Sequence, residues 1–185
     1  MVVFKVGLVW YPVSTLGYGK RLGVWFQGCK KRCRNCISPE FQGQEGGREA
    51  VAEAILDAFC ENMQPDGLTI SGGEPFDQPE ALLELVVAFK KRFNDDILIF
   101  TGYTLEELHE KKSLAVEGIL KNIAVLIDGS YVEEQNNGVG LRGSSNQKIY
   151  VWKYKERYEN AEAFTRRMQC VLLKENLLMI GIPPK

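Results

Sequence analysis

The stretch GLTISGGEP, from Gly67 to Pro75, is a short β-favouring run that ends at two glycines, followed by Glu-Pro. Such a run predicts a buried strand that is followed by a turn. The residues after it, QPEALLELVVAFKKRF (78–93), have the apolar spacing of an amphipathic helix with basic residues at its C-terminal end. Asp77 and Glu80 have the spacing of a capping box at its start. The stretch therefore predicts one strand–turn–helix unit.

The same alternation of strand and helix continues on both sides of this unit. Strands are predicted at 21–27, 96–102, 123–128 and 148–154, and helices at 48–63 and at 105–112, where Thr104 and Glu107 form the cap. A polar, helical stretch is predicted after 154, before the apolar C-terminal segment LLMIGIPP (177–184). Repeated strand–helix units imply parallel strands with right-handed crossovers.

The length of the chain limits the kind of parallel fold. A complete eight-stranded barrel takes about 250 residues, which is more than the 185 of this chain. The prediction is an α/β fold, namely an incomplete, open (β/α) barrel of about five or six mainly parallel strands, in a single domain over residues 1–185.

Four polar segments lie at the C-terminal ends of predicted strands. They are the cysteine-containing loop from Gly28, GGEP (72–75), TGYT (101–104) and DGS (128–130). The carboxyl ends of parallel strands meet at one edge of the sheet, and such sheets carry their chemistry there. The sequence therefore predicts a single site built from these segments.

The composition excludes several classes of function. Apolar residues make up 45% and charged residues 25%, and Lys+Arg 23 against Asp+Glu 24 leave a net charge of −1, so no overall field attracts nucleic acid. No segment approaches the roughly 20 apolar residues of a membrane span, and the N-terminal residues lack the basic region of a signal peptide. We therefore expect no nucleic-acid or membrane partner and a cytoplasmic location, where thiols stay reduced.

Three of the five cysteines lie in one loop, with the spacing Cys29-x3-Cys33-x2-Cys36. In a reducing compartment, clustered cysteines indicate a metal site or catalysis. A closed iron–sulfur cluster uses four cysteine ligands, so a set of three leaves one iron with an open position. The other two cysteines, Cys60 and Cys170, lie beside apolar residues and are predicted to be buried thiols.

A zinc site is the alternative interpretation of the same loop. Its fourth ligand would be His109, the single histidine of the chain. Because Leu105 and Leu108 mark the buried side of the predicted helix, His109 is expected to be exposed. Three roles stay open for the basic residues of the loop, namely solvated charge, neutralisation of an anionic cluster or contact with an acidic redox partner. These residues are Lys30, Lys31, Arg32 and Arg34.

The cysteine motif, followed one strand–helix unit later by Gly72-Gly73-Glu74-Pro75, resembles the radical SAM enzymes. Further stretches narrow the resemblance to the activating enzymes of anaerobic (class III) ribonucleotide reductases. They are GKRLGVWFQGC (19–29), FTGYTLEEL (100–108), LIDGSYVEE (126–134) and LRGSSNQKIY (141–150). Together they extend over most of the chain.

This resemblance implies an enzyme with a [4Fe–4S] cluster on Cys29, Cys33 and Cys36 and S-adenosylmethionine (SAM) at the open iron. One electron cleaves SAM to methionine and a 5′-deoxyadenosyl radical, which removes a Cα hydrogen from a glycine of the partner. The implied partners are the glycyl-radical subunit of an anaerobic ribonucleoside-triphosphate reductase and a flavodoxin- or ferredoxin-type electron donor. Two alternatives stay open: another glycyl-radical enzyme, peptide or small molecule as the substrate, and a non-enzymatic zinc-binding or electron-transfer module.

The GGEP segment supplies the first candidates for SAM binding. Gly72 and Gly73 allow the backbone to approach a ligand closely, and Glu74 offers a carboxylate to the ammonium group of the ligand. The structural alternative is a strand-to-helix turn without a ligand, where glycine pairs are common.

The other candidates lie at later strand ends and in two loops. Thr101 and Tyr103 are candidates for the adenine or ribose pocket, and Asp128 for the ribose or a cation, with packing of Tyr103 and a turn position for Asp128 as alternatives. Residues 142–147 have two possible roles, contact with partner or cofactor and a surface loop held by its own side chains. Asn35 stands where many radical SAM enzymes have an aromatic residue, and asparagine tolerates a left-handed backbone.

Overall fold

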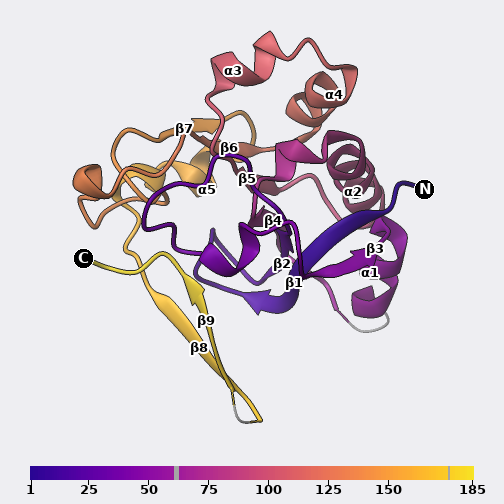
Figure 1. Cartoon of the computed structure of the whole chain (residues 1–185), viewed down its shortest axis with the longest axis horizontal. Coiled ribbons are helices and arrows are strands. Elements are labelled where there is room, and N and C mark those ends of the chain that lie inside the picture. The colour runs from indigo at the N-terminus through magenta and orange to yellow at the C-terminus, as the bar shows by residue number, and fades with distance from the viewer. Residues whose placement is uncertain (61–62, 175) are drawn as a thin grey trace.

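The computed structural model describes residues 1–60, 63–174 and 176–185 (Figure 1). Its main element is a seven-stranded sheet in the order β3-β1-β2-β4-β5-β6-β7. The central strands are parallel, namely β2 (Arg21–Phe26), β4 (Gly67–Gly72), β5 (Ile97–Phe100) and β6 (Val125–Asp128). The flanking pairings are antiparallel and involve β1 (Phe4–Val13), β3 (Arg48–Ala50) and β7 (Lys148–Val151). The chain is therefore a mixed α/β protein with a parallel central sheet.

Helices cover one face of this sheet. They are α1 (Ala52–Cys60), α2 (Pro79–Arg92) and α4 (Leu114–Asn122), with the short α3 (Leu105–Glu110) before α4. Helix α2 packs against both α1 and α4 (Figure 1). Because side chains alternate along a strand, Ile97 and Ile99 of β5 lie in the core on this face, whereas Leu98 lies in the core on the other face.

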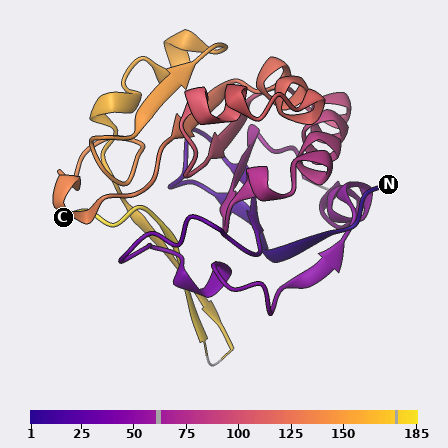
Figure 2. The same cartoon turned by 45° about the horizontal axis from the view of Figure 1, so that its top comes forward.

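The C-terminal part of the chain covers the second face. Tyr158, at the end of α5 (Lys155–Tyr158), packs with Leu98. Strands β8 (Met168–Leu173) and β9 (Asn176–Gly181) form an antiparallel hairpin, and its base packs through Ile180 against Trp25 of β2. The rest of the hairpin projects from the body of the molecule in both views (Figures 1 and 2). A parallel sheet buried on both faces explains the nearly continuous apolar strands.

The sequence-based prediction of about five or six strands is too low for the described residues. The sheet also contains β1 and β3, which the sequence did not predict. The first residues of the predicted helix at 48–63 instead form β3, which pairs with β1. The polar stretch predicted to be helical holds only α5 and a 3-10 turn at Ala161–Ala163 before the hairpin begins. Pairing partners distant in the sequence override local propensity at these places.

The two predicted helix caps have different outcomes. The capping box of Thr104 and Glu107 is present at the start of α3. The predicted box of Asp77 and Glu80 is wrong, because α2 begins after Gln78 without a side-chain cap. Asp77 lies in a 3-10 turn (Pro75–Asp77), and its carboxylate accepts hydrogen bonds from other segments.

The single residues outside the cysteine motif also differ in outcome. Cys170 is exposed in β8, so its predicted burial is wrong, because β8 lies in the projecting hairpin. The side chain of Cys60 lies outside the described residues. His109 is exposed on α3, as predicted. Among the described helices, none combines the length and the apolar character needed to cross a membrane.

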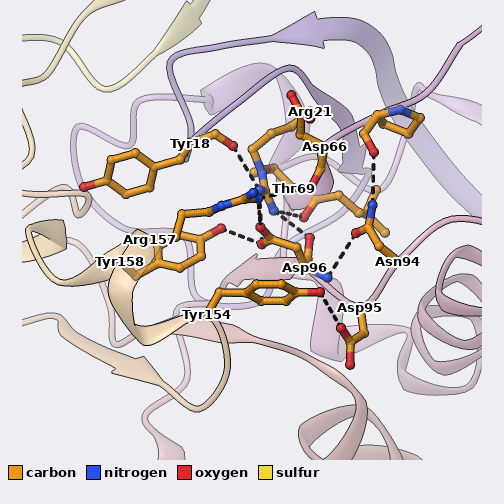
Figure 3. Close-up of polar contacts among 12 residues, drawn as sticks. Tyr18, Arg21, Asp66, Thr69, Asn94, Asp95, Asp96, Tyr154, Arg157 and Tyr158 are labelled. Carbon is orange, nitrogen blue, oxygen red and sulfur yellow. Dashed lines mark hydrogen bonds and ion pairs between the residues drawn. The ribbon is translucent and has the colours of Figure 1, made fainter.

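A buried polar network lies at the end of the sheet where the parallel strands begin (Figure 3). Arg21 at the start of β2 forms an ion pair with Asp96, the residue before β5, and both side chains are at most 1% exposed. Asp96 also accepts hydrogen bonds from Arg157 and Tyr158 of α5. The network therefore connects α5 to the N-terminal ends of the parallel strands, opposite the end that carries the predicted site.

Candidate functional site

The cysteine loop connects β2 to a 3-10 turn at Pro39–Phe41. Its ends are held together, because Gly28 N donates to Phe41 O at 2.8 Å and Cys29 N donates to Gln42 O at 3.1 Å. Between these points Arg32 and Asn35 adopt left-handed backbone conformations, with φ of 45° and 54°. The prediction that Asn35 accommodates a left-handed backbone is confirmed.

The structure brings most of the predicted site residues to one pocket of about 610 Å³. Its wall includes the three thiols of the loop, at Cys29, Cys33 and Cys36. The ends of β4 and β5 contribute Gly72, Gly73, Glu74 and Thr101. Parallel pairing explains this meeting, since Phe26 at the end of β2 is in register with Gly72, and β5 follows β4 in the sheet.

The thiols have the chemistry of a cluster-binding set. All three are half-buried, and the Cys29 sulfur accepts backbone N–H groups of Lys31 and Arg32, as sulfurs around iron–sulfur clusters do. Burial raises the pKa of the Cys29 thiol, and the charges of Glu74 and Asp77 raise it further, against the backbone hydrogen bonds. Within the described residues, no three Cys, His, Asp or Glu side chains are grouped closely enough to hold a metal ion. Three thiols in one pocket wall are the donor type of an iron–sulfur cluster, although in this structure they are not grouped closely enough to bind one metal ion together.

The two glycines of GGEP allow the end of β4 to pack directly on the cysteine loop. Gly72 has a φ of 101°, which favours glycine. A Cβ on Gly73 would lie 2.1 Å from the carbonyl oxygen of Gly28. This approach permits the hydrogen bonds from Gly73 N to Phe26 O at 2.7 Å and from Glu74 N to Gly28 O at 2.8 Å. The glycines therefore position the cysteine loop as well as the predicted ligand site.

Replacing Gly73 by alanine is expected to lower the free energy of unfolding by about 1–3 kcal/mol, because the added methyl group overlaps backbone that cannot move aside alone. Urea unfolding measures this loss. Gly43→Ala in the same region is the matched control, because its Cβ would lie 3.5 Å from the nearest atom, Glu45 O. The close approach at Gly73 would have no energetic role if both variants unfolded at the same urea concentration.

Glu74 connects the GGEP turn to the end of β5. Its side chain is 1% exposed and accepts hydrogen bonds from Phe76 N, Thr101 Oγ1 and Gly102 N at 3.0, 2.8 and 2.7 Å. Burial raises the pKa of Glu74 to about 7, although these three donors favour the carboxylate. A carboxylate has about four acceptor positions, and these three hydrogen bonds use three of them.

Tyr103 and Asp128, unlike Thr101, are not among the described residues that line the pocket. The Tyr103 hydroxyl donates to Asp77 Oδ1 at 2.7 Å. Asp128 is 2% exposed and accepts hydrogen bonds from the backbone N–H groups of Leu105 at 2.7 Å and Lys148 at 3.1 Å. Asp128 therefore joins the starts of α3 and β7 behind the pocket wall.

The loop at 142–147 is held partly by its own side chains, which is one of the two alternatives given for it, and partly by Arg166, which the sequence patterns do not single out. Gln147, which lines the pocket, donates to Gly129 O at 2.7 Å, and its side-chain oxygen accepts from Gly143 N at 2.7 Å. Arg142 forms an ion pair with Glu162 at 2.7 Å. Arg166 is buried and donates to several loop carbonyls, including that of Arg142 at 2.6 Å. No motif indicated Arg166, because its partners lie more than 20 residues away in the chain.

Strand β9 supplies an apolar wall that the sequence analysis also missed. Leu178, Met179 and Ile180 line the same pocket as the thiols. Asn35 lines it as well, and its side-chain amide donates to Glu133. The only signal for this wall in the sequence was the apolar C-terminal segment, which carries no information on its distant partner.

The comparisons with known proteins agree with this geometry. Residues 15–150 match the family described as 4Fe-4S single cluster domain. The chain is 28% identical over 155 residues to the anaerobic ribonucleoside-triphosphate reductase-activating protein of Enterobacteria phage T4, an alignment that covers 78% of this chain and 96% of the phage protein.

Pyruvate formate-lyase-activating enzymes match over shorter segments. The enzyme of Clostridium pasteurianum is 31% identical over 137 residues, which cover 69% of this chain and 54% of that protein. The enzyme of Listeria monocytogenes is 32% identical over 89 residues, which cover 43% and 36%. The family match includes the cysteine loop, the GGEP turn, strands β2 to β6 and most of β7, and the chain therefore belongs to the 4Fe-4S single cluster domain family, among the radical SAM activating enzymes.

Proposed function

We propose that this chain cleaves SAM reductively and generates a glycyl radical on an anaerobic ribonucleoside-triphosphate reductase. The observation that carries the proposal is the pocket in which Cys29, Cys33 and Cys36 face the GGEP turn and Thr101. The match over nearly the whole length of the phage activating protein supports the choice of partner.

The cysteine loop is proposed to hold a [4Fe–4S] cluster through its three thiols, with SAM on the iron that has no protein ligand. A bound cluster supplies the electron that breaks a carbon–sulfur bond of SAM, which leaves methionine and a 5′-deoxyadenosyl radical. Transfer of a hydrogen atom from a glycine Cα of the partner then yields 5′-deoxyadenosine and the glycyl radical.

The residues of the pocket bind and orient SAM in this proposal. A volume of about 610 Å³ lies within the range of small-molecule sites. In this proposal the backbone at Gly72 and Gly73 would lie against the methionine moiety, and the remaining acceptor position of Glu74 would accept a hydrogen bond from its ammonium group. Strand β9 contributes apolar side chains to the pocket wall, of which Ile180 is buried. Tyr103 and Asp128 act from behind the wall by fixing Asp77 and the start of α3.

We further propose that the parallel strands form the open barrel of radical SAM enzymes, in a single domain over residues 1–185. The position of the pocket at the carboxyl ends of β2, β4 and β5 supports this fold. A flavodoxin- or ferredoxin-type protein in the cytoplasm is the proposed electron donor.

Electron paramagnetic resonance tests the function. Anaerobically reconstituted protein is reduced and mixed with SAM and the reductase, and we expect a glycyl doublet together with 5′-deoxyadenosine. Cleavage of SAM without the doublet would assign the chain to a different substrate. The same assay with pyruvate formate-lyase tests the second candidate, which the clostridial match favours but over only 54% of that enzyme.

A further inference from the structure

Lys31 differs from the other basic residues of the cysteine loop. Lys30, Arg32 and Arg34 are exposed, whereas the side chain of Lys31 is 19% exposed and lines the pocket. Its ammonium group donates to both carboxylate oxygens of Glu107, each at 2.8 Å. A partner on α3 therefore holds this one cation in a defined place beside the thiols.

Tyr103 forms a second connection between the loop and the turn after β5. The Lys31 ammonium lies 4.2 Å from the centroid of the Tyr103 ring, a cation–π geometry. The Tyr103 hydroxyl donates to Asp77 Oδ1 at 2.7 Å, and Asp77 Oδ2 accepts from the backbone N–H of Lys30 at 3.0 Å. Tyr103 therefore contacts the Lys31 side chain directly and is connected to the backbone N–H of Lys30 through Asp77.

Glu107 is itself fixed by the helix that it caps. Its Oε2 accepts the backbone N–H of Thr104 at 2.8 Å, in the capping box of α3. The carboxylate therefore has a fixed position relative to the end of β5, where Thr101 and Gly102 bind Glu74. The Lys31 side chain also lies close to Gly102, because a Cβ built on Gly102 would be 3.1 Å from Lys31 Cγ.

We propose that Lys31 is a positioning residue, which with Glu107 and Tyr103 clamps the first turn of the cysteine loop and places a fixed positive charge in the wall of the cluster pocket. Reduction adds a negative charge to a cluster, so a nearby cation favours the reduced state and raises the reduction potential. The effect on the potential rests on the proposed function, whereas the clamp does not.

Hydrogen exchange on the metal-free chain tests the clamp. In Lys31→Met, the backbone amides of residues 30–32 are expected to exchange about tenfold faster, as for the loss of a charge-assisted hydrogen-bond pair. Lys30→Met removes the same charge from an exposed neighbouring side chain and is the matched control, with unchanged exchange. Equal exchange in the two variants would overturn the clamp.

Redox titration of the reconstituted protein, followed by electron paramagnetic resonance, tests the charge. Lys31→Met is expected to make reduction about tenfold less favourable, a shift of 59 mV to lower potential for a one-electron couple. Glu107→Gln keeps the helix cap and the cation but removes the neutralising carboxylate, so the potential is expected to rise. Lys31→Arg retains the charge and is expected to restore the potential of the original protein.

Shifts of opposite sign in Lys31→Met and Glu107→Gln would not arise from a merely structural role. A shift in the same direction in both variants, or an equal shift in Lys30→Met, would overturn the electrostatic role. If the original protein forms no cluster, the proposed function fails, and hydrogen exchange still decides whether Lys31 clamps the loop.

Discussion

Cys33→Ala is expected to abolish the iron–sulfur cluster and all reductive cleavage of SAM. Three thiols of one loop lie in the pocket wall, and among the described residues of that wall no other thiol could replace Cys33 as a ligand. Iron and sulfide analysis after anaerobic reconstitution is expected to fall from about four irons per chain to background. The glycyl doublet is expected to disappear with it.

Cys170→Ala is the matched control for this loss. Cys170 is exposed in β8 and is not among the described residues of the pocket wall. Its replacement is expected to leave the iron content and the doublet unchanged. Full iron content in Cys33→Ala would remove the cysteine loop from cluster binding, and one zinc without iron in the original protein would favour the zinc-binding alternative.

Arg21→Met is expected to lower the free energy of unfolding by about 3–5 kcal/mol. The Arg21 side chain is fully buried and donates to Asp96 Oδ1 at 3.2 Å and to Thr69 Oγ1 at 2.7 Å. It also donates to the backbone oxygens of Tyr18 and Asp96 (Figure 3) and to that of Leu68. Methionine fills much of the volume but leaves these buried acceptors without donors, and urea unfolding measures the cost.

Two control variants show how the free-energy cost of removing a paired cation depends on its burial. Lys121→Met removes a cation paired with Glu117 at 3.8 Å, but those side chains are 76% and 52% exposed, so the expected loss is under about 0.5 kcal/mol. Arg157 binds the same Asp96 and is 41% exposed, so Arg157→Met is expected to lie between the two. An Arg21→Met loss no larger than that of Lys121→Met would show that the network does not hold this edge of the sheet.

The parallel centre of the fold was predictable because its strands are buried on both faces. The segments at β2, β4, β5 and β6 are apolar runs bounded by turns, which local patterns detect. Strand β3 is too short and too polar to show such a pattern, and it exists only because β1 offers a free edge. Strands β8 and β9 carry exposed leucines, so alternation of apolar and polar residues is weak there.

The parts of the candidate site that lie at strand ends were also predictable from the sequence. The cysteine motif, GGEP and Thr101 were found because each directly follows a strand, and parallel pairing brings such positions together. The role of Asp77 was assigned wrongly because its partners, Lys30 and Tyr103, are 47 and 26 residues away. A local capping rule cannot include competing donors at that distance.

The sequence by itself determined the chemistry available at this site: three thiols with fixed spacing, glycines that admit close approach, and strand ends that share one edge. These are local properties, set by residue type and by the period of each element. Only the tertiary structure decided that Lys31 turns inward to Glu107, that Glu74 accepts hydrogen bonds from Thr101 and Gly102 after β5, and that β9 lines the same pocket. Those features depend on contacts between segments distant in the chain, and the energies of burial and of charge arise where such segments meet.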